Sequence, residues 1–300
     1  MRQVPDHISH LRARPAPMLP AGEMVIGMTP HDAAEFLPRV FNLCRAAQSL
    51  AVCAALGLPV SDAAEAELAQ DILRDHVVKI ALKWPAYLGL PPLALPPAWQ
   101  SNSQLLRQTL FGPTGQLPSR LDGFDLFLDQ GQGIGSVLSH LRQVFMRGEA
   151  CTGPLPLVTS TSAFALTCQE NSVAARQAAR PVMAQIENAY GRGPFWRATA
   201  IAYDIESCLE GTLPALERPR KGAVAVPAAR GIYTVDATLK DGRVTTFRRV
   251  TPTDHLLVKD GVLDQSLAKF LGRKDSATAK LLLDILDPCV PVQIEEVSHA

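Results

Sequence analysis

The sequence predicts an α+β fold that is predominantly helical, with one small antiparallel hairpin or sheet region. Apolar residues recur every three or four positions along much of the 300-residue chain, which is typical of amphipathic helices. Two β-rich runs between residues 232 and 250 flank Lys240-Asp241-Gly242, and a glycine in such a turn is typical of a β-hairpin. We expect residues 1–23 to form a polar N-terminal arm and residues 24–300 to form a single domain.

Helix starts and stops divide the first third of the chain. Thr29 and Pro30 supply a hydroxyl cap and a proline at the first helical position. Because proline lacks an amide hydrogen, Pro38 is expected to end or kink this helix. The predicted segments here are a helix ending near Leu37, a non-helical passage over residues 39–44, a helix over 45–56, a helix from Ser61 to about Trp84, and a proline-rich loop over 85–99.

The rest of the chain is predicted as helices around the hairpin. Pro181 lies inside a long apolar-periodic segment and is expected to kink it. The predicted helices cover residues 104–110, 136–146, 171–190 with the kink, 196–209, 264–271 and 276–285.

Charge and composition exclude several classes of function. Lys and Arg total 29 and Asp and Glu total 29, so the formal net charge is zero. Nucleic acids and anionic membranes are recognised by clustered positive charge, so neither is expected as a partner. The six cysteines are dispersed, no apolar signal segment precedes them, and every long uncharged stretch is broken by prolines or hydroxyls. We therefore expect a cytoplasmic protein with free thiols and no membrane-spanning segment.

Two cysteines stand where a thiol can react or bind a metal. Cys44 is predicted at a helix start, where free amide groups favour the thiolate. Cys289 follows Asp287-Pro288, where the proline prevents the helix from continuing. Packing in the core is the competing interpretation for both, since a free cysteine is most often a small buried hydrophobe. The sequence has no CxxC, HxxxH or HExxH motif and so no self-contained zinc site.

Two further residues are candidates for contacts to a ligand. Arg230 lies before Gly231 at the start of a predicted strand, where it could present a fixed cation to an anion. His76 lies beside an apolar helical stripe. The competing interpretations are a surface arginine and a hydrogen-bonded core histidine.

Several segments together resemble nickel-iron hydrogenase large subunits, in the order found in that family. Residues 27–34 and 39–51 resemble its G-x-x-P-x-D-A and R-I-C-G-V-C-x-x-x-H-x-L-A segments, and Leu286-Asp287-Pro288-Cys289 resembles the start of its D-P-C-x-x-C-x-x-H. The other matches are Asp75-His76 to its Asp-His pair, residues 227–231 to its A-P-R-G turn, and Thr251-Pro252-Thr253 to its P-T-x-W-N segment. Residues 85–220 match poorly.

The departures from this pattern bear on the chemistry that the resemblance implies. In the active enzymes four thiolates hold nickel, and two of them bridge to an iron carrying cyanide and carbon monoxide. Here Phe41 and Val292 stand at two of the four cysteine positions, and Gln48 stands at the histidine position. Phe and Val cannot ligate a metal, so we expect no complete nickel-iron centre and no hydrogen turnover.

A large-subunit-like chain with one cysteine retained at each end resembles the hydrogenase accessory proteins of the HupK or HoxV type. This resemblance implies a truncated large-subunit-like helical core and a non-enzymatic role in cofactor maturation. The protein would be a scaffold or carrier for the iron-cyanide-carbonyl fragment, working with HypC- and HypD-type proteins and delivering to the hydrogenase large subunit. Cys44 and Cys289 would be the iron ligands, with sulfurs roughly 3 to 5 Å apart. Arg230 would donate a hydrogen bond to a cyanide nitrogen. His76 would at most support the residues that contact the fragment, without contacting it directly.

Three alternatives stay open at the level of sequence. The first is a metal-free protein-binding module in hydrogenase assembly. It could be an active metalloenzyme with an unusual site, which would reduce a dye with hydrogen. Cys44 and Cys289 could also form a regulatory disulfide, which requires Cα atoms less than about 7 Å apart.

Overall fold

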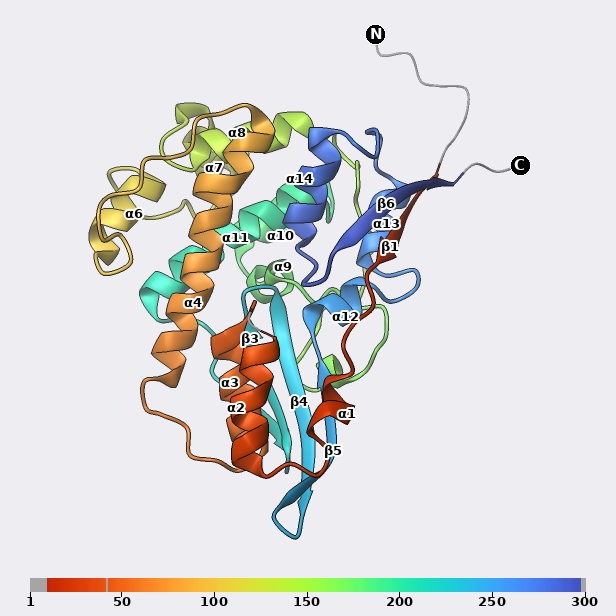
Figure 1. Ribbon diagram of the computed structural model, residues 1–300. Helices are drawn as coiled ribbons and strands as arrows, with labels where there is room; N and C mark the ends of the chain where they lie inside the picture. The colour runs from red at the N-terminus through yellow and green to blue at the C-terminus, as the bar shows by residue number, and fades with distance from the viewer. Residues whose placement is uncertain (1–9, 42, 298–300) are drawn as a thin grey trace.

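The computed structural model describes residues 10–41 and 43–297, in which a body of helices lies against one end of a four-stranded sheet (Figure 1). Two helices near the N-terminus, α2 and α3, lie beside this sheet, and α4 runs from them into the helical body. No helix in these ranges is long and apolar enough to cross a membrane. The predominantly helical α+β prediction is confirmed.

The helices up to the middle of the chain are α1 (Ala21–Val25), α2 (Pro30–Val40), α3 (Arg45–Ala55), α4 (Ala64–Val78), the π-helical turn η1 (Lys79–Lys83), α5 (Trp84–Leu88), α6 (Ser103–Phe111), α7 (Leu121–Gln130) and α8 (Gly135–Val144). Those that follow are the 3-10 turn η2 (Ser162–Phe164), α9 (Val173–Gln177), α10 (Pro181–Tyr190), α11 (Pro194–Glu210), α12 (Pro252–Leu256), α13 (Val262–Ala268) and α14 (Ala277–Leu286). Of these, α1, η2, α7 and α12 were not predicted, and α5 lies mostly in the segment predicted as a proline-rich loop.

The main sheet is antiparallel, with strands in sequence order. Its strands are β2 (Glu217–Arg220), β3 (Ala223–Ala228), β4 (Gly231–Lys240) and β5 (Arg243–Val250). The predicted hairpin is therefore β4–β5, and Asp241 and Gly242 in its turn both have positive φ. The antiparallel pairing also extends one strand before the hairpin, because β3 pairs with β4 from Ala223↔Asp236 to Ala228↔Gly231.

A second sheet joins the two ends of the described chain. β1 (His10–Pro15) pairs antiparallel with β6 (Val292–Val297), so part of the predicted N-terminal arm is a strand. The predicted boundary at residue 23 falls inside α1. Residues 1–9 of the arm and 298–300 of the predicted domain lie outside the described residues.

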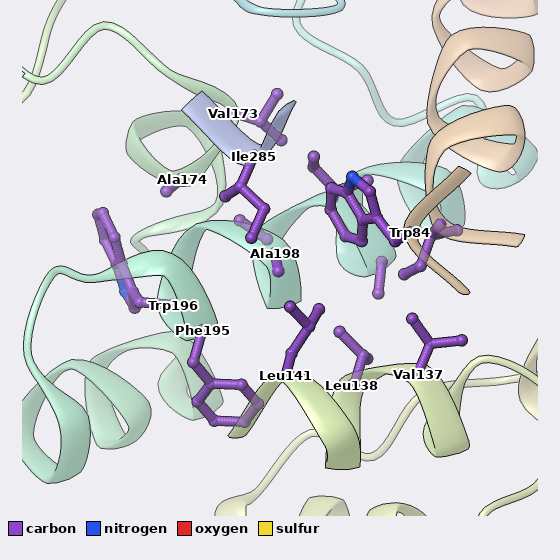
Figure 2. Packing of buried hydrophobic residues seen from close by; sticks show 14 of the residues in the cluster. Trp84, Val137, Leu138, Leu141, Val173, Ala174, Phe195, Trp196, Ala198 and Ile285 are labelled. Carbon is purple, nitrogen blue, oxygen red and sulfur yellow. The ribbon is translucent and has the colours of Figure 1, made fainter. Parts of the chain in front are cut away.

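Two apolar clusters hold these elements. The larger is built around α11, with Trp84, Leu138, Leu141 and Phe195 packed together (Figure 2). The smaller joins α2 and α3 to the inner face of β3 and β4. The helix α4 contributes Leu73 and Val77 to the first cluster and Leu68 and Ile72 to the second. It therefore fixes the sheet relative to the helical body.

Prolines account for most of the differences from the predicted helices. The helix α2 continues through Pro38 to Val40, because a proline in the last turn removes only one hydrogen bond and the Phe41 amide still bonds the Leu37 carbonyl at 2.9 Å. Asn42, in the predicted non-helical passage, lies outside the described residues. The prediction of one kinked helix over 171–190 is wrong. Pro181 begins a new helix, since the residue before a proline, Arg180, is held extended.

The predicted helix ending near Trp84 also differs, because the helical path changes its hydrogen-bond pattern at Lys79. Pro85 cannot donate to the carbonyl of Ala81, which instead accepts the amide of Leu93 at 2.8 Å. The residues before Pro85 form the π-helical turn η1, and helical structure ends at Gly89 in the left-handed conformation.

Candidate functional site

One cavity of about 270 Å³ brings together three of the four predicted site residues. Cys44, Cys289 and Arg230 all line it, although they lie far apart in sequence. Cys44 comes from the start of α3, Arg230 from the β3–β4 turn, and Cys289 from the chain after α14. The distance between the two sulfurs stays a prediction.

Cys44 is the N-cap residue of α3, as predicted. Its backbone lies outside helical geometry, and its carbonyl accepts the first helical hydrogen bond from the Gln48 amide at 3.0 Å. The predicted preference for thiolate is wrong in direction. Burial raises the pKa of the Cys44 thiol, and the nearby Arg230 guanidinium only partly opposes the rise. The thiol is therefore protonated at neutral pH, and binding a metal there would release a proton.

Cys289 is placed by the end of α14. The helix stops at Leu286, and Asp287 turns the chain with φ of 52° before Pro288. The backbone amide of Cys289 then donates to the Thr253 hydroxyl at 2.9 Å. Thr253 belongs to the short helix α12, which is itself fixed by a capping box. The cysteine is thus anchored through its backbone while its side chain lines the cavity.

Arg230 occupies the tight turn between β3 and β4. Its Nη1 donates to the Cys44 sulfur at 3.0 Å, and its Nε lies 2.8 Å from the Asp287 carboxylate. The side chain is 9% exposed, so this contact is shielded from water. Gly231 has φ of 144°, and a Cβ there would lie 2.3 Å from the Asn171 side-chain oxygen, so only glycine fits after the arginine.

A buried ion cluster that the sequence did not predict lies behind Arg230. The Lys79 ammonium donates to the carboxylates of both Asp75 and Asp287. Burial alone would lower the pKa of Lys79, but Asp287 and Asp75 outweigh it and raise the pKa. In the structure, the π-helical turn that begins at Lys79 marks this cluster as a candidate functional site, because such turns occur often at functional sites.

His76 is not among the residues that line the cavity. It is fully buried on α4, and its Nε2 lies 2.9 Å from the Asp204 carboxylate on α11. Asp204 also pairs with Arg176, whose guanidinium donates to the backbone carbonyls of Ala228 and Gly231. The histidine therefore reaches the β3–β4 turn through Asp204 and Arg176, and its Nδ1 also lies 3.9 Å from the Asp75 carboxylate of the ion cluster. The Gln177 side chain also donates to Asp204. We call His76, Asp204, Arg176 and Gln177 the Asp204 network.

The residues that replace family ligands occupy different places. Phe41 and Gln48 line the same cavity as Cys44. Val292 is the first residue of β6 and pairs with Pro15. Within residues 10–41 and 43–297, no three His, Cys, Asp or Glu side chains are grouped to hold a metal ion. The cavity is thus lined by two thiols that could ligate a metal, those of Cys44 and Cys289.

Comparison with solved structures defines the class of fold. The NiFeSe hydrogenase of Desulfovibrio vulgaris Hildenborough in its as-isolated oxidized state matches with a TM-score of 0.58 and 13% identity, over 94% of this chain and 96% of that one. The H2-activated NiFeSe hydrogenase of Desulfomicrobium baculatum matches with a TM-score of 0.58 and 12% identity, over the same shares. The protein has a hydrogenase large-subunit-like fold, as predicted.

Sequence comparison narrows this to one family. No protein-family model matches the chain. The hydrogenase expression/formation protein HupK of Rhodobacter capsulatus is 44% identical over 286 residues, which cover 95% of this chain and 93% of that protein. The chain belongs to the HupK family of hydrogenase expression/formation proteins, which confirms the resemblance drawn from the motifs.

Proposed function

We propose that this protein acts in hydrogenase maturation as a non-catalytic scaffold that carries the iron-cyanide-carbonyl fragment before its delivery. Cys44 and Cys289 are the proposed iron ligands, and Arg230 is the proposed donor to a cyanide nitrogen. The partners proposed for loading and delivery are HypC- and HypD-type proteins and the hydrogenase large subunit. The observation that carries the proposal is the shared cavity of Cys44, Cys289 and Arg230.

The chemistry of these groups fits such a cargo. A low-spin iron with three diatomic ligands needs few protein donors, and soft thiolates are suitable ones. The Arg230 guanidinium already lies 3.0 Å from the Cys44 sulfur, so it would stabilise a thiolate there once a metal displaces the proton. Two anchors rather than four also favour release, which a carrier requires.

The test is infrared spectroscopy of the full chain, purified without oxygen from cells that express the HypC- and HypD-type proteins. Bound cyanide and carbon monoxide absorb where protein does not. We expect these bands in the wild type and their loss in Cys44→Ala and Cys289→Ala. Cys53→Ala is the matched control, because Cys53 lies on the same helix as Cys44 but does not line the cavity. Bands absent from the wild type, or retained in both site variants, would overturn the proposal.

A metal-free protein-binding module is the second candidate, and the rim of the cavity favours it. Met18, Leu19 and Leu43 line the same cavity yet are 44%, 54% and 59% exposed. Exposed apolar side chains around a cavity are typical of protein-binding surfaces. Pull-down of HypC-type protein or large subunit by wild type and by Leu43→Glu tests this function. Partner capture without infrared bands would favour the module over the carrier.

A further inference from the structure

The wall of the cavity beside Cys44 carries polar side chains that the proposed iron ligands do not use. Gln48, Tyr233 and Arg249 line the same cavity as the two cysteines. Gln48 comes from α3, Tyr233 from β4 and Arg249 from β5, and Val235↔Arg249 pairing fixes the two strands in register. We call these three residues the polar wall.

Two atoms of the polar wall are buried without a partner. Gln48 is 2% exposed and Tyr233 is 4% exposed. Neither Gln48 Nε2 nor the Tyr233 hydroxyl has a hydrogen-bond partner within the described chain. Leaving a buried polar atom unpaired is unfavourable, so each such atom needs an explanation, and an atom that lines a cavity can be paired by a ligand.

The third residue adds a positive charge to the wall. Arg249 stacks on the Phe41 ring, with its guanidinium carbon 3.6 Å from the ring centroid. It forms no salt bridge within residues 10–41 and 43–297, whereas Arg230 and Lys79 are balanced by Asp287 and Asp75. Burial raises the pKa of Tyr233 to about 12, while Arg249 and Gln48 lie close enough to oppose that rise, though outside hydrogen-bonding geometry.

We propose that Gln48, Tyr233 and Arg249 form an anion subsite that binds the nitrogen end of a linear cyanide-type ligand. All three side chains can donate a hydrogen bond, and the surplus charge of this wall is positive. A terminal cyanide nitrogen accepts such bonds and takes little space. The subsite rests on the proposed function for the source of its ligand, since in the cell the cyanide would be carried on the iron.

The subsite is tested with thiocyanate and the purified full chain without iron, so that the result does not depend on the carrier function. Thiocyanate carries a terminal nitrogen and a C≡N stretch that reports its surroundings. We expect saturable binding by calorimetry, weakened about tenfold in Tyr233→Phe and Gln48→Leu, since each variant loses one hydrogen bond to the charged ligand. Gln48→Glu keeps the side-chain volume but adds a negative charge, and it should weaken binding further.

Matched controls come from elsewhere in the core. The hydroxyls of Thr199 and Ser266 are also buried and unpartnered within the described chain, but these residues do not line the cavity. Thr199→Val and Ser266→Ala should bind thiocyanate as the wild type does. Circular dichroism verifies that every variant is folded. No saturable binding to the wild type, or equal binding by folded polar-wall variants, would overturn the subsite.

The infrared experiment on the iron-loaded protein separates the two proposals. Cyanide bands absent from the wild type would end the carrier proposal, while variant-sensitive thiocyanate binding would still support the subsite. With both proposals correct, Tyr233→Phe should keep the bands but shift a cyanide stretch, whereas Cys44→Ala should lose them.

Discussion

Two buried polar clusters meet the β3–β4 hairpin, and they differ in how fully their atoms are paired. In the Asp204 network, one carboxylate accepts hydrogen bonds from His76, Arg176 and Gln177, and the second ring nitrogen of His76, Nδ1, has no hydrogen-bond partner within the described chain. In the polar wall, the Tyr233 hydroxyl and the Gln48 amide nitrogen have no partner within the described chain. The Asp204 network holds the hairpin turn in place, whereas the polar wall has the unpaired hydrogen-bond donors expected of a ligand-binding site.

The largest effect is expected from breaking the Asp204 network. Asp204→Asn leaves the Arg176 guanidinium, 6% exposed, without its opposite charge. Removing one partner of a buried ion pair typically costs about 3–5 kcal/mol, so the free energy of unfolding should fall by about that amount in urea titrations. Asp125→Asn is the control, because its partner Arg142 lies nearer the surface and the loss should stay below about 1 kcal/mol. Equal losses in both variants would contradict the central role of Asp204.

Acid should weaken the same network. Burial alone would raise the pKa of Asp204, but Arg176 and His76 outweigh it and hold the pKa well below the usual range. An unfolded aspartate has a pKa of about 3.9, so the stabilisation is complete above that pH and is lost as the pH falls below it. Urea titrations from pH 6 to pH 2.5 should show the gap between wild type and Asp204→Asn shrinking below about pH 4. A gap that is constant across this range would contradict the assignment.

A smaller effect is expected on the pKa of the Cys44 thiol, which lines the cavity and contacts Arg230 in the hairpin turn. Arg230 opposes the rise that burial causes in the pKa of Cys44, so Arg230→Gln should raise that pKa further. Alkylation of Cys44 by iodoacetamide should then be several-fold slower at pH 8 and need a higher pH to reach the same rate. Mass spectrometry of the Cys44 peptide measures this. The rate at Cys53, whose pKa is raised by burial alone, should not change, and an unchanged rate at Cys44 would refute the contact.

Local signals in the sequence predicted where Cys44, Cys289 and Arg230 lie, but not which residues contact them. The positions of Cys44, Cys289 and Arg230 depend on a helix start, a proline after a helix and a turn glycine, all of which act over a few residues. The partners of these residues depend on pairing across the fold, since Lys79 meets Asp287 from 208 residues away and His76 meets Asp204 from 128. The same holds for β1 and β6, whose pairing neither segment indicates alone. The unpaired atoms of Gln48 and Tyr233 could not be predicted, because a missing partner is visible only when all neighbours are in place.

The smallest effect is expected from the polar wall itself, and it has the opposite sign. Tyr233→Phe and Gln48→Leu each remove a buried polar atom that has no partner within the described chain, so the iron-free protein should be as stable as the wild type or up to about 1 kcal/mol more stable. Tyr203→Phe is the matched control. The Tyr203 hydroxyl donates to the Pro118 carbonyl at 2.5 Å, so its removal should cost about 1 kcal/mol. Urea unfolding of the three variants at one pH makes the comparison.

Equal losses for Tyr233→Phe and Tyr203→Phe would mean that the Tyr233 hydroxyl is paired within the protein. A gain for Tyr233→Phe together with weaker thiocyanate binding would show that the protein keeps an unfavourable group in its core for the sake of a ligand.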